Sequence, residues 1–376
     1  MKSASPPARW LVLATLLLVS SARAQDSDQQ QGPSDTSPPP GGNTGAGLVL
    51  PSAFGSVELG GWLRAREAIS AKEDKVLKGI LSIPSARLEF TYQWKKRLKA
   101  VVEFDVTDGL KDAYASLKLV DGLAVRVGQF KVPLSLVELE STARLPVVRR
   151  GLLREVLSED TLNLTGRRVG AQLEWQCTGC ERVVRVRAGV FQNDPERASL
   201  QQGLGLVPMA RATWQVLESL ELGGSARAEL LGTSPSGVAA NWTAGLDLKH
   251  ALPFGWGEWR SWAEVLVGRS SVLSGAQGRM LTGRALTAVR FGGVSKGARY
   301  VEPFAMLSVL EPDLKTRNDL LGEGVGGINV GQWRRWRLQA QVERRVAQAA
   351  VPALLSVLDD DLVTRKALLL QLEVVF

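Results

Sequence analysis

Hydrophobic and polar residues alternate with a period of two over most of the chain after Gly55. Leu88 and Phe90 share one parity, whereas Arg87 and Glu89 share the other. This alternation predicts β-strands with one apolar face and one polar, charged face. Soluble β-sandwiches alternate in the same way, so the period alone does not tell which environment the apolar face meets.

The alternating segments predict sixteen strands, an even number that returns the chain to the side from which it started. We expect strands near 55–69, 81–94, 97–107, 110–120, 122–130, 166–176, 182–192, 206–217, 220–230, 240–250, 258–268, 280–292, 297–310, 319–332, 335–346 and 363–376. Tight turns alternate with longer loops between them, as in outer-membrane barrels. The pattern therefore predicts an all-β fold, a transmembrane antiparallel β-barrel of about sixteen strands.

Tryptophan gathers at the strand ends where the predicted turns are short. Seven of the eleven tryptophans lie at or beside these ends: Trp94, Trp175, Trp214, Trp256, Trp259, Trp333 and Trp336. Because an indole ring settles at the headgroup level of a membrane, this clustering predicts an aromatic girdle. The alternative is that these rings only fill turns.

The last strand alternates in the same way and ends on an aromatic residue. Its apolar face comprises Leu368, Leu370, Leu372, Val374 and Phe376. This ending resembles the terminal signal of bacterial outer-membrane barrels. We therefore expect this face to contact outer-membrane lipid and Phe376 to be recognised by the barrel-insertion machinery.

The N-terminal segment has the features of an export signal. Basic residues precede an apolar run from Trp10 to Val19, and Ala24 closes a small-residue cleavage motif. The residues that follow are rich in Gln, Ser, Pro and Gly and offer almost nothing to bury. We expect a signal peptide over 1–24, a disordered periplasmic linker over 25–50 and the outer-membrane barrel over 51–376.

Six segments between residues 85 and 194 carry a more specific pattern. They read SARLEF (85–90), VVEFD (101–105), LKDAYASLK (110–118), RVGQFKVP (126–133), GRRVGAQLE (166–174) and AGVFQND (188–194). In order and spacing they resemble the phosphate-selective porin O and P family. The resemblance implies an outer-membrane porin that forms a water-filled channel for passive diffusion of small anions, such as phosphate or polyphosphate, and that assembles as a homotrimer. At 148–151 this chain has Val-Arg-Arg-Gly where the family carries an aromatic-x-Glu-Arg-Ser pattern, so no role is carried over for that glutamate.

The longest connection, residues 131–165, is the third on the long-loop side. It carries apolar residues along its length, among them Leu134, Leu145 and Leu152. A long amphipathic loop is rarely left free in solvent. We expect it to fold inward and narrow the lumen, as the corresponding loop does in the family; the alternative is an external flap.

The inward parity places many cations in the lumen. We expect pore-lining and anion-binding roles for Arg64, Arg66, Arg87, Arg126, Lys131, Arg149, Arg150, Arg168, Arg185 and Arg187. Rings of Arg and Lys attract anions, and a guanidinium binds phosphate oxygens in pairs. The cations of the long connection, Lys131, Arg149 and Arg150, are expected to approach Arg126 and Arg168 at the narrowest point of the lumen. Acids share the lining, so a general, non-selective porin remains the alternative.

Few residues could support catalysis or metal binding. The chain has one histidine, His250, and two cysteines, Cys177 and Cys180. A structural zinc site needs about four ligands, so the Cys-x-x-Cys spacing favours a disulfide in an oxidising compartment, with a reactive dithiol as the alternative. We expect no enzymatic activity, no cofactor, no metal site and no nucleic-acid partner. The rival function is a non-transport outer-membrane barrel, either a structural anchor or an enzyme.

Overall fold

The computed structural model describes residues 48–52, 55–72, 75–157, 164–193, 205–234, 237–269, 278–293, 297–348 and 365–376. The expected signal peptide and most of the expected linker lie outside these residues. In the part of the chain that is described, no helix is long and apolar enough to cross a membrane.

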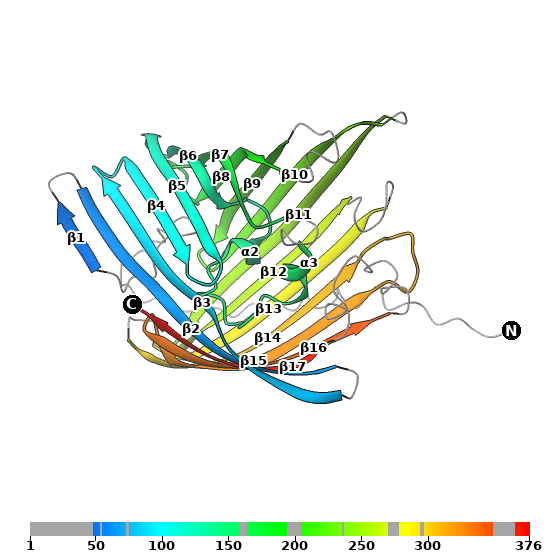
Figure 1. Ribbon diagram of the computed structural model, residues 1–376. Helices are drawn as coiled ribbons and strands as arrows, with labels where there is room; N and C mark the ends of the chain where they lie inside the picture. Colours follow the sequence, from blue (N-terminus) through cyan, green and yellow to red (C-terminus); the bar gives the residue numbers. More distant parts are fainter. Residues whose placement is uncertain are drawn as a thin grey trace. The chain divides into compact units, whose positions relative to one another are not determined.

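The described residues form one antiparallel sheet that closes on itself (Figure 1). Its strands are β1 (Leu48–Ser52), β2 (Gly55–Lys72), β3 (Lys75–Trp94), β4 (Leu98–Asp105), β5 (Gly109–Val120), β6 (Leu123–Lys131), β7 (Arg167–Gln176), β8 (Val184–Gln192), β9 (Leu206–Leu217), β10 (Leu220–Ser234), β11 (Gly237–Phe254), β12 (Gly257–Arg269), β13 (Met280–Gly292), β14 (Arg299–Glu311), β15 (Leu321–Gln332), β16 (Trp336–Ala347) and β17 (Lys366–Val375). Each strand from β2 onward pairs with the next, and β17 pairs back with β2. The ring therefore contains sixteen strands, which confirms the predicted barrel.

The strand β1 lies outside this ring of sixteen and was not predicted. It forms a hairpin with β2, in which Leu48 lies opposite Leu59. The strand β17 uses the same edge of β2 further along, where Val375 lies opposite Trp62. Thus β1 continues the line of β17 along β2, and the sheet begins at Leu48, three residues before the expected start of the barrel. Five residues including a proline are too few for a periodic signal.

Two hairpins are longer than the pattern predicts. Residues 70–80 were expected to be a loop, but β2 runs to Lys72 and β3 starts at Lys75. Likewise, β10 runs to Ser234 and β11 starts at Gly237. These extensions lack strict alternation, so the period of two did not reveal them.

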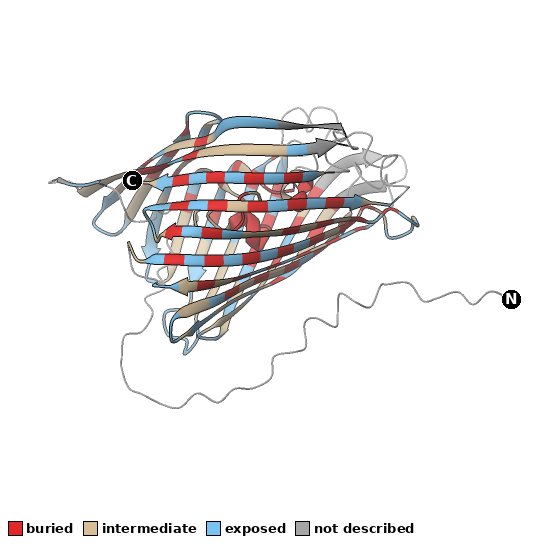
Figure 2. Cartoon of the chain, turned by 90° about the horizontal axis from the view of Figure 1, so that it is seen from below, coloured by how far each residue is buried: buried red, intermediate tan, exposed pale blue. Residues whose placement is uncertain are grey.

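Burial alternates along the strands with the predicted parity (Figure 2). In β6, Arg126 is 1% exposed on the inner face, whereas Val127 is 54% exposed on the outer face. In β17, Leu369, Gln371 and Glu373 are buried inside the ring, and Leu370 and its outward neighbours are exposed. A polar interior with an apolar outer surface is the arrangement of a transmembrane barrel.

The predicted girdle residues are mostly exposed at strand ends. Trp94, Trp175, Trp214, Trp256, Trp259 and Trp336 are exposed. Trp333 is half-buried instead, because the guanidinium of Arg290 lies 3.7 Å from the centre of its ring.

The apolar core of the molecule lies inside the barrel, around the connection between β6 and β7. This segment, which we call the inward loop, contains the short helices α2 (Leu136–Leu139) and α3 (Leu152–Leu157), both seen within the ring of strands in Figure 1. One cluster joins Leu134 and α3 to Phe130, Phe191 and other inward residues. A second joins α2 and Leu145 to inward residues of β12 to β15. The loop therefore packs in the lumen through its leucines and valines.

Candidate functional site

The entrance to the inward loop is fixed by Lys131, the last residue of β6. Its ammonium group donates to the carbonyl oxygens of Glu138 at 2.8 Å, Leu139 at 3.3 Å and Glu140 at 3.0 Å. These carbonyls lie at the C-terminal end of α2, where they have no partner within the helix. Lys131 therefore caps α2 and turns the chain back into the lumen.

The first anchor of the loop is a buried charge cluster on β12 and β13. Arg284 donates through Nε to Glu264 Oε1 at 2.9 Å and through Nη1 to the carbonyl oxygen of Arg150 at 2.7 Å. The Ser135 hydroxyl donates to Glu264 at 2.8 Å, and Glu138 lies 3.5 Å from Arg284. One arginine thus joins the wall to both ends of the loop segment 135–150.

The second anchor is a set of polar side chains on β15 and β16 that bind the loop backbone. Arg337 donates to the carbonyl oxygens of Leu145 and Thr142, both at 2.7 Å. Asn329 and Gln339 both donate to the carbonyl oxygen of Pro146, at 2.8 and 3.0 Å. Backbone carbonyl groups of the loop that would otherwise lack hydrogen-bond partners inside the barrel are therefore bound by side chains of its wall.

The third anchor holds α3. Glu323 accepts from the backbone N–H of Leu152 at 2.6 Å and pairs with Arg345 at 2.7 Å. Gly151 adopts a φ of +76°, and a Cβ there would lie 2.1 Å from a Glu323 carboxylate oxygen. Glu155 extends the network to Arg345 at 2.7 Å. The glycine is required because the carboxylate approaches the backbone so closely.

Most predicted wall cations lie inside the barrel but are paired with carboxylates. Arg64 lies 2.6 Å from Glu373, Arg87 lies 2.8 Å from Asp105, Arg126 lies 2.8 Å from Glu174, and Arg185 lies 3.5 Å from Glu221. A paired guanidinium is largely neutralised as a source of potential for a passing anion.

Three predicted wall cations have other surroundings. Arg66 donates to the amide oxygen of Gln371 at 2.8 Å, and Arg168 donates to Asn193 at 3.2 Å. Arg187 is half-buried on β8 and lies opposite Glu174 in the strand register.

The loop cations do not converge on Arg126 and Arg168, as the sequence led us to expect. Arg149 lies 3.8 Å from Glu343 on β16. Arg150 lies 3.5 Å from Glu138, within the loop. The expectation was wrong because buried carboxylates on the wall and on the loop itself attract these cations, and the constriction is a mixture of both charges.

The loop carboxylates are held in the ionised form. Burial alone would raise the pKa of Glu140, but the ammonium group of Lys249, 2.5 Å away, is the main influence that lowers it to about 2. Burial opposes ionisation of Glu138 as well, and Arg150, Arg154 and Arg284 together lower its pKa. These groups therefore stay charged near neutral pH, where they keep the loop attached.

The sequence reasoning missed the residues that carry the anchors. Arg284, Glu323 and Arg345 face inward with the parity of their strands, so the lumenal position of these residues could have been found. Which partner each one binds could not, since Ser135 and Glu264 are 129 residues apart.

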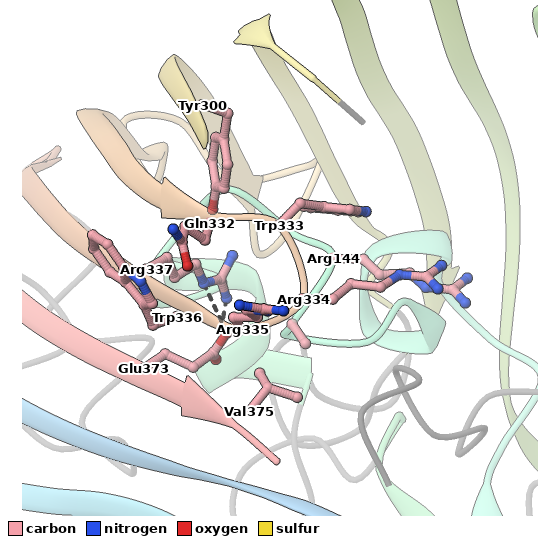
Figure 3. Close-up of a pocket in the computed structure, with 11 residues that line it drawn as sticks. Arg144, Tyr300, Gln332, Trp333, Arg334, Arg335, Trp336, Arg337, Glu373 and Val375 are labelled. Carbon is pink, nitrogen blue, oxygen red and sulfur yellow. Dashed lines mark hydrogen bonds and ion pairs between the residues drawn. The ribbon is translucent and has the colours of Figure 1, made fainter. Parts of the chain in front are cut away.

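Two small cavities lie where the loop meets the wall. One, of about 40 Å³, lies between the loop and the wall of β2 to β7 and is lined by Trp62, Arg87, Glu89, Glu103, Asp112, Lys131, Ser141, Thr142, Arg150 and Arg167. The other, of about 30 Å³, lies beside the turn between β15 and β16 (Figure 3). There Arg337 pairs with Glu373, and Arg144 reaches in from the loop.

Other candidate chemistry has a structural place. The sulfur atoms of Cys177 and Cys180 are joined as a disulfide in the turn between β7 and β8. Within the described ranges, no group of three or more His, Cys, Asp or Glu side chains is placed to hold a metal ion.

A family model and several solved structures are similar to this chain. The model for phosphate-selective porin O and P matches residues 68–240, which confirms the resemblance over that range. No curated protein matches the chain.

The solved structures agree in fold at low identity. An anion-selective porin from Comamonas acidovorans is 14% identical with a TM-score of 0.56, covering 85% of this chain and 99% of its own. The outer-membrane expressed OmpT of Vibrio cholerae is 11% identical with a TM-score of 0.58, covering 88% and 100%. The outer-membrane channel DcaP of Acinetobacter baumannii is 9% identical with a TM-score of 0.57, covering 87% and 99%.

The family match and the closed barrel support the same assignment. The chain has the fold of an outer-membrane porin and matches a porin family over nearly half its length. It is therefore an outer-membrane barrel of a bacterium.

Proposed function

From the match to the phosphate-selective porins over residues 68–240, we propose that this chain forms a water-filled channel for passive diffusion of small anions, with phosphate as a candidate solute. A modest surplus of unneutralised cations in the lumen supports this proposal. The signal peptide, the linker and the contact of Phe376 with the insertion machinery are part of the same proposal.

The surplus is found by asking which lumenal charges lack an oppositely charged partner. Among the described residues, Arg66, Lys99, Lys131, Arg144 and Arg187 have no carboxylate within 4 Å of their nitrogen atoms, and the inward acids Glu58 and Glu89 have no such cation. The difference is 5 − 2 = +3 formal charges. Cations that no protein carboxylate neutralises are the ones that can replace part of an anion's hydration.

The test is the zero-current potential of the purified protein in planar bilayers across a KCl gradient. We expect a potential of the sign that indicates preference for chloride. Replacing Lys99 and Arg187 by Gln should reduce it, whereas the double variant Arg126→Gln with Glu174→Gln, which removes a paired cation together with its carboxylate, should reduce it less. A cation-preferring wild type would contradict the proposal.

A general porin is the second candidate, and the pairing of most lumenal arginines favours it. The same measurement separates the two, because a general porin gives a potential near zero. We also propose a homotrimer; one structure of OmpT of Vibrio cholerae, 11% identical with a TM-score of 0.56 and covering 86% of this chain and 100% of its own, is described as a trimer form. Cross-linking of the detergent-extracted protein tests this.

A further inference from the structure

The indole N–H of Trp62 is a buried hydrogen-bond donor without an acceptor. Trp62 lies on the inner face of β2 and is only 6% exposed, and its Nε1 has no partner among the described residues. A buried donor left unsatisfied has lost its hydrogen bonds to water without gaining a replacement, which destabilises the folded state. A native structure rarely keeps such a group unless something that is not part of the chain satisfies it.

Trp62 is also one of the residues that line the 40 Å³ cavity between the loop and the wall of β2 to β7. A water needs about 10–15 Å³ by this measure, so the cavity has room for about three water-sized groups. Arg150 also lines the cavity and has a buried Nε without a partner, whereas two further cations of the lining are engaged within the protein. Lys131 caps α2, and Arg167 lies 2.9 Å from Asp112.

The net charge of the residues that line the cavity favours binding of a small oxyanion only weakly. Four cations and three carboxylates line it, which leaves 4 − 3 = +1. Two of the carboxylates, Glu103 and Asp112, are held by Arg87 and Arg167. The indole N–H of Trp62 is neutral and already desolvated, so a hydrogen bond from it adds affinity for an oxyanion without changing this charge balance.

The ring of Trp62 is held in place by cations. The guanidinium carbons of Arg64 and Arg87 lie 5.5 and 5.0 Å from its centre. Arg64 also donates to the Thr142 hydroxyl of the loop at 2.8 Å. The indole is therefore positioned before a ligand arrives, so little ordering is needed when one binds.

We propose that Trp62 is a binding residue for small oxyanions in the lumen, where its indole N–H donates to an oxygen of an anion that enters this cavity. The proposal rests on the proposed anion channel and names one residue that decides how strongly the channel holds an oxyanion. Ser141 and Thr142, which also line the cavity, are within the same site.

The experiment measures how inorganic phosphate inhibits the KCl conductance of the purified protein in planar bilayers. Trp62→Phe removes the N–H and keeps an aromatic ring. We expect the half-inhibiting phosphate concentration to rise about tenfold or more, because hydrogen bonds to charged groups are worth about 1.5–3 kcal/mol. The conductance in KCl without phosphate is recorded for each variant, and the inhibition by phosphate is expressed relative to it.

Trp262 offers a matched control. It is a second inward tryptophan with a buried, unpartnered Nε1, but it packs against the loop cluster of α2 and does not line this cavity. Trp262→Phe should leave phosphate inhibition unchanged. Trp62→Tyr, which retains a hydroxyl donor, should recover part of the lost affinity and also serves if Trp62→Phe fails to fold.

Three results would overturn the proposal: no inhibition of the wild type by phosphate, equal inhibition of Trp62→Phe and wild type, or equal shifts from the Trp62 and Trp262 variants. Failure of the proposed anion channel is seen separately, as a zero-current potential without chloride preference in the wild type.

Discussion

Replacing Arg284 should detach the inward loop more than any other single substitution in the lumen. Arg284 is fully buried, pairs with Glu264 and Glu138, and binds the carbonyl oxygen of Arg150. Arg284→Met keeps the length of the side chain but removes all of these interactions. Glu138 still has Arg150 and Arg154 within 3.5 Å, so the loss falls mainly on Glu264.

The magnitude follows from what is left behind. In the variant, Glu264 keeps the Ser135 hydroxyl at 2.8 Å as its remaining donor among the described residues. Breaking a buried ion pair by removing one partner costs about 3–5 kcal/mol. The double variant Arg284→Met with Glu264→Gln removes the stranded charge as well, so it should recover most of this loss. That recovery would show that the uncompensated charge is the cause.

The assay is urea-dependent unfolding of the protein in detergent micelles, followed by tryptophan fluorescence. Single-channel recording of the same samples should show more current noise in Arg284→Met, because the loop loses its first anchor. Arg185→Gln is the control: its pair with Glu221 is 3.5 Å long and partly wet, so its loss should cost less than about 1 kcal/mol. A cost for Arg284→Met no larger than for Arg185→Gln, or a double variant no more stable than the single one, would refute the reasoning.

Two further predictions concern the loop. The folded-state pKa values of Glu138 and Glu140 lie below their ordinary value of 4.5. The stabilising effect of the two carboxylates is therefore fully present above pH 4.5 and is lost as the pH falls toward 2. Current noise should rise on acidification to about pH 3, and unchanged noise would count against this. Lys131→Met should lower the urea midpoint less than Arg284→Met does, because it removes three hydrogen bonds from one ammonium group but strands no charge; an equal or larger drop would be inconsistent with the capping role.

The barrel was predictable because its signal is local and repeated. In β17, the side of every residue follows from the period of two, and both the outward Leu370 and the inward Gln371 lie where that period places them. The short strand β1 was missed because its pairing with β2 depends on the free edge beyond β17. No property of residues 48–52 themselves reveals that edge.

The charge pattern of the constriction was less predictable, for a physical reason. The inward parity correctly places cations such as Arg64 and Arg87 in the lumen, but the partner of each depends on how the loop crosses the barrel. Arg149 and Glu343 are 194 positions apart and meet only when the loop is folded. A count of cations therefore overstated the local positive potential, because the carboxylates that neutralise them lie on distant strands.

The two kinds of lumenal cation should have different roles. Arg284, Arg337 and Arg345 pair with carboxylates, and each is part of a network that holds the inward loop, so they contribute to stability. Lys99 and Arg187, on β4 and β8, have no such partner among the described residues and lie on other strands than these anchors. Their charges remain available to a solute. On our proposal, a substitution of the first kind changes the urea midpoint and current noise, whereas one of the second kind changes the zero-current potential, so the loop's attachment and the channel's ion preference can be altered independently.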